Sequence, residues 1–230
     1  MLTKRIPALC FFVAIAFAVA SLSASAQTSI ALSGYGAFSG TTTANGTQQS
    51  PANQAGGIFE LRHISNPIFG FEATYSFNRA NQTYRNAPTG CPAFGCAIST
   101  ETVRSNAHEV TADWTPSVHI ANVRPFGVLG VGLLLDVPDS SQATVVTTLP
   151  GEPPCPSTGC TTTTTSNTKI SWKPVYVYGA GLDWGLLPHL GLRLQYRGNL
   201  YSAPNVTNLF SSTNTFTHTA EPMVGIYFSL

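Results

Sequence analysis

The amino-acid sequence predicts an all-β fold: an eight-stranded, antiparallel, up-and-down transmembrane β-barrel with four long loops on one side and short turns on the other. Three observations support this prediction. Eight segments of about ten residues alternate apolar and polar side chains at a period of two, as barrel strands do. The connections between these segments are alternately long and short. Only 9% of the 230 residues are charged, well below the roughly 25% usual in soluble domains.

The start of the chain has the pattern of a secretory signal peptide. A positively charged beginning and a short apolar run precede Ala24 and Ala26, which are the small residues of a cleavage site. The run lacks the length and the flanking sequence of a stop-transfer helix. We therefore expect cleavage after Ala26, so that residues 1–26 are removed and residues 27–230 form one barrel domain.

The eight alternating segments are the predicted strands. In the third, apolar residues from Phe69 to Phe77 alternate with small or polar ones, as in a strand with two unlike faces. The faces of the first and fifth strands are less clearly defined. Pro125, Pro174 and Pro222 lie inside three segments and indicate strand ends or bulges there, because proline removes a ladder donor. The predicted strands are Ser29–Gly40, Ala55–Ile64, Ile68–Arg79, Arg104–Thr115, Val123–Leu135, Ile170–Gly185, Leu190–Tyr201 and Thr215–Leu230.

The connections between the predicted strands alternate in length. The short ones are Ser65–Pro67, Pro116–Asn122 and Leu186–His189, and the long ones are Thr41–Asn53, Ala80–Val103, Asp136–Lys169 and Ser202–Asn214. Four long loops and three short turns place both ends of the barrel domain on the short-turn side. This is the layout of bacterial outer-membrane barrels, which have tight periplasmic turns and longer external loops.

The apolar face of the strands is expected to contact lipid. Charge is scarce even on the polar face. Trp172 and Trp184 share one face twelve residues apart, which corresponds to about 30 Å along the axis of a barrel with tilted strands. This is near the spacing of the two aromatic girdles of a membrane barrel. Trp114, at the turn end of the fourth strand, is expected to join the periplasmic girdle.

The opposite face carries charges that we expect to point into the lumen. Six are acidic and five are basic, and an eight-stranded barrel is only wide enough for its side chains to fill. Because an unpaired buried charge is costly, we predict a network of ion pairs that blocks conduction; a narrow ion path is the alternative. The predicted lumen residues are Glu60, Arg62, Glu72, Glu109, Asp113, Arg124, Lys173, Asp183, Arg193, Arg197 and Glu221.

Four cysteines form two matching pairs, Cys91 with Cys96 and Cys155 with Cys160. In each pair proline follows the first cysteine and glycine precedes the second, which favours a tight turn. Export to an oxidising compartment favours disulfides. Zinc is the alternative, although no histidine lies beside either pair. The sequence leaves open whether each pair closes on itself or bonds across the two loops.

Other functions have less support in the sequence. The mature chain carries nine basic and ten acidic residues, so no basic patch indicates nucleic-acid binding. His108 and His218 are the candidate bases of a lipid A-modifying enzyme, but no motif links either to a serine. The run Thr161–Thr165 is expected to be a solvated external loop. We expect no catalytic residue, cofactor or metal site.

Over residues 27–230 the chain resembles the small outer-membrane barrels of the OmpA barrel-domain, OmpX and opacity-protein type. The most specific part is the last strand, where Tyr227, Phe228 and Leu230 resemble the C-terminal insertion signal of that family, which usually ends in phenylalanine. The resemblance implies an outer-membrane location and assembly by periplasmic chaperones and the barrel-assembly machinery. It also implies contact with outer-membrane lipid and lipopolysaccharide.

Together these features predict a non-enzymatic outer-membrane β-barrel protein with a charge-filled lumen. Its role is expected to be structural, or to be contact with an extracellular partner through the long loops, and the sequence does not identify that partner. A small porin, or an OmpW-like channel for small or apolar solutes, is the alternative. A lipid A-modifying barrel enzyme is the third hypothesis.

Overall fold

The computed structural model describes residues 27–86, 88, 96–149 and 159–230. The predicted signal peptide lies outside these residues, and its cleavage stays a prediction. In the described part of the chain, no helix is both long and apolar enough to span a membrane.

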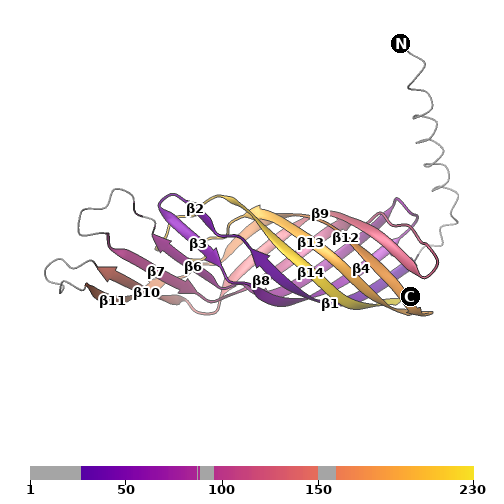
Figure 1. Cartoon of the computed structure of the whole chain (residues 1–230), viewed down its shortest axis with the longest axis horizontal. Coiled ribbons are helices and arrows are strands. Elements are labelled where there is room, and N and C mark those ends of the chain that lie inside the picture. The colour runs from indigo at the N-terminus through magenta and orange to yellow at the C-terminus, as the bar shows by residue number, and fades with distance from the viewer. Residues whose placement is uncertain (1–26, 87, 89–95, 150–158) are drawn as a thin grey trace, which may run out of the picture.

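Eight strands close into an antiparallel barrel (Figure 1). The last strand pairs with the first and completes the ring. In ring order the strands are β1 (Gln27–Ser39), β4 (Gln54–Ile64), β5 (Gly70–Arg79), β8 (Ser105–Trp114), β9 (Val123–Pro138), β12 (Ser171–Leu187), β13 (Leu190–Ser202) and β14 (Phe216–Ser229). The predicted fold class is confirmed, and each strand begins and ends within a few residues of its predicted bounds.

The two faces of the barrel wall have opposite chemistry. Leu129, Val131 and Leu133 of β9 point outward and are 55%, 58% and 58% exposed. On the inner face Arg62 and Arg197 are fully buried. A soluble protein has the reverse arrangement, with apolar side chains inside. Closure of the ring gives every barrel strand a hydrogen-bonded neighbour on each side, which a strand in hydrocarbon requires.

The structure also defines the faces of the strands that the sequence left open. In β1, Leu32 and Phe38 point outward, whereas Ser33 and Tyr35 are buried in the lumen. In β9 the leucine-rich set of alternate residues faces outward, and the other set, which includes glycines and Phe126, faces inward. The outer wall is therefore apolar around the whole ring.

The three prolines lie where the strand ladders are incomplete. Pro174 pairs with β9, but the pairing of β12 with β13 begins only at Val175. Pro125 lies beyond the end of the β8–β9 ladder, which stops at Leu129. Pro222 lies at a gap in the β1–β14 ladder. Each proline thus has no paired residue on one of its two neighbouring strands. The N–H donor that proline lacks is not needed there.

A second sheet extends beyond the loop end of the barrel (Figure 1). Its strands, in sheet order, are β11 (Cys160–Asn167), β10 (Gln142–Leu149), β7 (Ile98–Val103), β6 (Gln82–Asn86), β3 (Thr47–Pro51) and β2 (Thr42–Ala44). The expectation that these segments are loops was wrong. Thr161–Thr165 is exposed, as expected, but it forms part of a strand that pairs with β10. Threonine and valine favour extended backbone, but the external strands are only three to eight residues long and largely polar, so they lack a clear alternating pattern.

The outward orientation of β9 can be tested at the middle of the lipid layer. Leu129 lies midway between Leu135, which pairs with Trp172, and Val123, which pairs with Trp184. Leu129→Arg is expected to lower the free energy of unfolding in lipid vesicles by about 2–4 kcal/mol, because it places a cation in hydrocarbon. Urea titration followed by tryptophan fluorescence measures this change.

Leu209→Arg is the matched control for this prediction, because Leu209 is 51% exposed in the last external loop. The control is expected to change the free energy of unfolding by less than about 0.5 kcal/mol. Equal losses in the two variants would contradict the membrane position of Leu129.

Candidate functional site

The barrel lumen is filled by charged side chains. Nine of the eleven predicted lumen residues are buried, namely Glu60, Arg62, Glu72, Glu109, Asp113, Asp183, Arg193, Arg197 and Glu221. The other two, Arg124 and Lys173, lie near opposite ends of the barrel and are partly buried. Arg124 lines an open vestibule of about 380 Å³ at the turn end. The candidate functional site is the buried group of nine.

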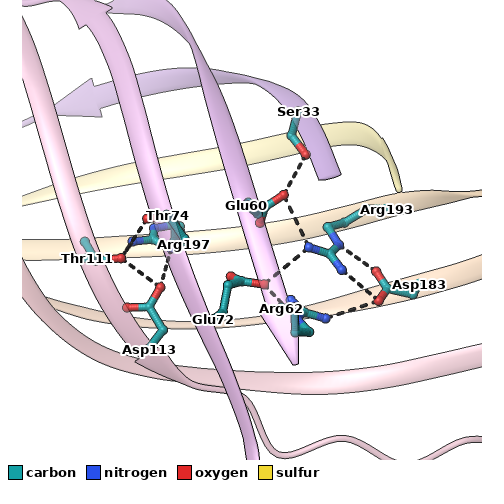
Figure 2. A network of polar contacts seen from close by, with 10 residues as sticks. All are labelled: Ser33, Glu60, Arg62, Glu72, Thr74, Thr111, Asp113, Asp183, Arg193 and Arg197. Carbon is teal, nitrogen blue, oxygen red and sulfur yellow. Dashed lines mark hydrogen bonds and ion pairs between the residues drawn. The ribbon is translucent and has the colours of Figure 1, made fainter. Parts of the chain in front are cut away.

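The first of two clusters joins two arginines to three carboxylates (Figure 2). Arg62 Nε donates to Glu72 Oε2 at 2.6 Å, and Arg62 Nη1 donates to Asp183 Oδ2 at 3.1 Å. Arg193 Nε donates to Asp183 Oδ1 at 2.7 Å. Arg193 Nη1 also lies 3.3 Å from carboxylate oxygens of both Glu60 and Glu72. Each arginine therefore bridges carboxylates from different strands.

The strand positions explain why this cluster crosses the lumen. Arg62 is on β4 and Asp183 is on β12, and these strands are not neighbours in the ring. Inward side chains on different sides of a narrow barrel can meet only across its axis. Phe126 of β9 lies beneath the Arg62 guanidinium, with the ring centroid 3.8 Å from Cζ. This contact is a cation–π interaction.

The second cluster lies around Arg197 (Figure 2). Arg197 Nη1 donates to Asp113 Oδ2 at 2.8 Å, and Nη2 donates to Thr111 Oγ1 at 2.8 Å. Glu109 Oε1 lies 3.5 Å from Nη2 and also accepts a hydrogen bond from Asn199 Nδ2. A Cβ on Gly130 would lie 1.8 Å from Asp113 Oδ1. Glycine at position 130 therefore leaves the space that the Asp113 carboxylate occupies.

Asp136 is a buried lumen residue that the sequence analysis missed. It was assigned to the start of a loop, but β9 continues to Pro138 and Asp136 is 1% exposed. Together with Glu109 and Glu221 it lines a small cavity of about 40 Å³ at the loop end of the lumen. The continued alternation of β9 beyond Leu135 was the signal that could have revealed it. The lumen is thus more acidic at this end than the sequence predicted.

The last external loop, residues 203–215, closes the space above this cavity. The Tyr84 hydroxyl of β6 donates to the Pro204 carbonyl and accepts from the Val206 amide, both at 3.1 Å. Burial raises the pKa of Tyr84 above its usual range, so the phenol stays protonated and can donate. Tyr84 and Val206 also pack with Phe210 in a buried apolar cluster.

A buried carboxylate beside Tyr84 holds the same loop, because Glu101 is the cross-strand partner of Tyr84. Thr207 Oγ1 donates to Glu101 Oε2 at 2.6 Å, and the Ser166 hydroxyl donates to Oε1. Glu101, in β7, is fully buried. Two hydroxyl donors thus satisfy both carboxylate oxygens, one from the loop and one from β11. The loop is tied to the external sheet at two points, Tyr84 and Glu101.

The candidate catalytic histidines lie outside the lumen. His108 Nδ1 is 2.8 Å from the Tyr75 hydroxyl, and His218 Nε2 is 2.8 Å from the Tyr178 hydroxyl. Both histidines share the outward parity of their strands. Neither has a hydrogen bond to a serine among the described residues. No group of three or more histidine, cysteine or acidic side chains in the described ranges could hold a metal ion.

The other predicted residues lie at the ends of the barrel. Trp114 and Trp184 point outward near the turn ends of β8 and β12, and Trp172 points outward at the loop end of β12. Phe228 and Leu230 also point outward, whereas Tyr227 lines the vestibule. Cys91 and Cys155 lie outside the described residues, so the predicted pairing with Cys96 and Cys160 stays a prediction.

Comparison with known proteins identifies a family. The family model described as "Outer membrane protein beta-barrel domain" matches residues 12–228. No curated protein sequence is significantly similar to the chain.

Several solved structures are similar in fold at low sequence identity. The chain is 15% identical to the attachment invasion locus protein Ail of Yersinia pestis, with a TM-score of 0.45, over 89% of this chain and 99% of Ail. It is 14% identical to Neisserial surface protein A, with a TM-score of 0.45, over 89% and 98% of the two chains. It is 11% identical to OprG from Pseudomonas aeruginosa, with a TM-score of 0.47, over 89% and 96%.

Removal of one shared carboxylate tests the first cluster. Asp183→Asn is expected to lower the free energy of unfolding by about 3–5 kcal/mol, because it removes one of the two carboxylates that the buried guanidinium groups of Arg62 and Arg193 share. Urea titration in lipid vesicles measures the loss. Arg124→Gln replaces a lumen-facing residue outside the ion pairs, and it is expected to lower the free energy of unfolding much less. A similar cost in both variants would contradict the network.

Removal of the Tyr84 hydroxyl tests the closure of the last loop. Tyr84→Phe leaves the buried Val206 amide without its acceptor, at a cost of about 1–3 kcal/mol. The amide of Val206 is expected to exchange hydrogen faster in the variant, while amides in the middle of β9 exchange as in the wild type. Unchanged exchange at Val206 would show that the loop is held without Tyr84.

Proposed function

Since this chain belongs to the outer membrane protein β-barrel family, we propose that it is a non-enzymatic barrel with a closed lumen that acts through its external surface. The chain lies in the bacterial outer membrane. A barrel at this location can form a pore, carry an active site, or present a surface. The distribution of charge in this barrel supports the third role.

The main support for a closed lumen is that Arg62 and Arg193 bridge carboxylates across it. Each guanidinium contacts two or more carboxylates, and all of these groups are almost completely buried. An ion that crossed the barrel would have to break several charge-assisted bonds in a space without bulk water. Breaking a single buried pair typically costs several kcal/mol. Such a lumen is a strong barrier to conduction.

The external end adds a second barrier. The last loop fills the space beneath the external sheet, where Val206 is fully buried, and is held there by Tyr84 and Glu101. The cavity below it measures only about 40 Å³, enough for about three water molecules. Neither a hydrated ion nor an apolar solute of ordinary size fits in such a cavity. This argues against the small-porin and apolar-channel hypotheses.

The enzyme hypothesis has the least support. An active site in a barrel wall requires a nucleophile and a base within hydrogen-bonding distance. His108 and His218 instead bond to tyrosines on the lipid-facing side. Support for a surface role comes from the external sheet, whose strand β11 presents a run of exposed threonines. External loops and their extensions are where barrels usually carry contact functions.

Planar-bilayer recording tests the closed lumen. The purified chain is expected to insert without steady conductance, because ion pairs and the last loop block both halves of the lumen. The paired change Arg62→Ala with Arg193→Ala is the comparison, and it is expected to give measurable channel events. Reproducible open-channel current from the wild-type protein would contradict the proposal and favour a small porin.

A further inference from the structure

The vestibule at the turn end of the barrel has the size of a small-ligand site. Its volume is about 380 Å³, within the range of about 300–1,000 Å³ that is usual for such sites. Lumen-facing residues of four strands form its inner lining, namely Ser29 of β1, Arg124 of β9, Asp183 of β12 and Tyr227 of β14. Because these side chains point into the barrel, the vestibule opens along the barrel axis. The tight turns of outer-membrane barrels face the periplasm, so it opens into that compartment.

The only acidic side chain in the lining, Asp183, is already engaged by the ion pairs beneath the vestibule (Figure 2). Its Oδ1 accepts a hydrogen bond from Arg193 Nε at 2.7 Å, and its Oδ2 accepts one from Arg62 Nη1 at 3.1 Å. The other two acids of that cluster, Glu60 and Glu72, do not line the vestibule. The negative charge below the vestibule is therefore held by two other arginines.

Arg124 is left without a protein partner. It is the cross-strand partner of Asp183 and is partly buried, yet among the described residues it forms neither an ion pair nor a hydrogen bond. Tyr227, Asn122 and His119 also line the vestibule, and their side chains form no hydrogen bond within the described ranges. One cation and three polar side chains thus line the same space with unused hydrogen-bonding groups.

Two glycines shape this space. A Cβ on Gly191 would collide with the Tyr227 ring, so glycine there lets the ring lie against β13. Gly185 lines the vestibule directly. A Cβ at that position would lie 3.5 Å from the Asn122 carbonyl oxygen and 3.6 Å from the Tyr227 hydroxyl. Alanine therefore fits at position 185, whereas a larger side chain would extend into the vestibule.

The mouth of the vestibule adds an apolar contact. Leu186 and Leu187, at the end of β12, are 50% and 63% exposed, and they line the vestibule together with Pro188. A cation inside and apolar side chains at the mouth suit an anion that carries an apolar group.

We propose that this vestibule binds the free C-terminal carboxylate of a periplasmic peptide. A guanidinium group pairs with a carboxylate through parallel charge-assisted hydrogen bonds, and Arg124 supplies that group. The Tyr227 hydroxyl and the Asn122 side chain bond to the carboxylate and to the adjoining peptide group. The terminal side chain of the peptide packs against Leu187 and Pro188 at the mouth.

The direction of the opening selects this occupant among anions. Lipid headgroups lie outside the barrel wall, whereas the inner lining consists of lumen-facing side chains. An extended peptide end can enter along the axis. A small anion such as acetate makes the contact with Arg124 but not the contact with the apolar mouth. This inference rests on the outer-membrane location and not on a role of the external surface, so conductance measurements leave it unaffected.

Binding of a labelled peptide to the protein in lipid nanodiscs, which leave both ends of the barrel accessible, tests the inference. The probe is the tripeptide alanyl-alanyl-leucine with an uncharged coumarin at its amino end. Fluorescence anisotropy is expected to show one saturable site for this peptide. The same peptide with a C-terminal amide is expected to bind about tenfold or more weakly, because the charge-assisted bonds to Arg124 are lost. Equal affinities, or no saturable binding of the carboxylate form, would overturn the proposal.

Arg124→Gln is expected to weaken binding of the carboxylate peptide about tenfold or more and to leave binding of the amide peptide unchanged. Lys173→Gln is the matched control, since it removes one positive charge from a partly buried, lumen-facing side chain. Lys173 lies ten residues along β12 from Asp183, which is about 33 Å and beyond a Debye length. Its replacement is expected to leave the affinity within about twofold of the wild type. Equal losses in the two variants would show a general charge effect and would overturn the site.

A change at Gly185 tests the position of the site with Arg124 in place. Gly185→Leu is expected to abolish binding because it fills the vestibule, whereas Gly185→Ala is expected to bind like the wild type. Heat-modifiable gel migration verifies that each variant is folded. Wild-type affinity in a folded Gly185→Leu variant would place the peptide elsewhere and overturn the proposal.

Competition separates the possible sources of the carboxylate. Unlabelled alanyl-alanyl-leucine is expected to displace the labelled peptide, and acetate or octanoate at the same concentration is expected not to do so. Displacement by acetate would indicate a general anion site, and displacement by octanoate alone would indicate a fatty-acid site. Either result would overturn the assignment to a peptide.

Discussion

The pairing of buried charges across the lumen is the interaction on which the rest of this structure depends. Hydrocarbon surrounds the wall, so charged side chains of the barrel strands must turn inward, where there is little water to solvate them. Arg62, Arg193 and Arg197 each satisfy more than one carboxylate, and together they join strands that are not neighbours in the ring. The same contacts that make the inward orientation tolerable also close the lumen.

We propose that a closed lumen shifts the function of the protein to its external end. The external sheet continues the barrel, and the last loop packs beneath it around Tyr84 and Glu101. Most acidic side chains of the described residues are buried. The exposed charged side chains there are therefore mainly basic, with four bases and one acid. Ion pairs fill the lumen, whereas the exposed charges of the described residues lie at the loop end and are mostly basic.

Much of the barrel could be predicted because its signals are local. Alternation at a period of two located all eight barrel strands, and the alternation of loop lengths indicated the topology. The predicted lumen residues on β4, β5 and β13, together with Asp183 on β12, are buried for the same reason, since parity alone determines their side of the wall. Among the external strands, β2, β3 and β6 were missed because they are only three to five residues long. The longer β11 was missed because its run of threonines has no apolar–polar alternation.

The sequence by itself determined which face of each strand is apolar and which residues carry charge inward, because side-chain parity is a property of neighbouring residues. Only the tertiary structure decided which charges meet. The partners Arg62 and Asp183 are 121 residues apart, and their contact depends on strand register and on the width of the closed ring. Tyr84 and Glu101 acquired their positions in the same way, from contacts with segments distant in the chain that no local pattern records.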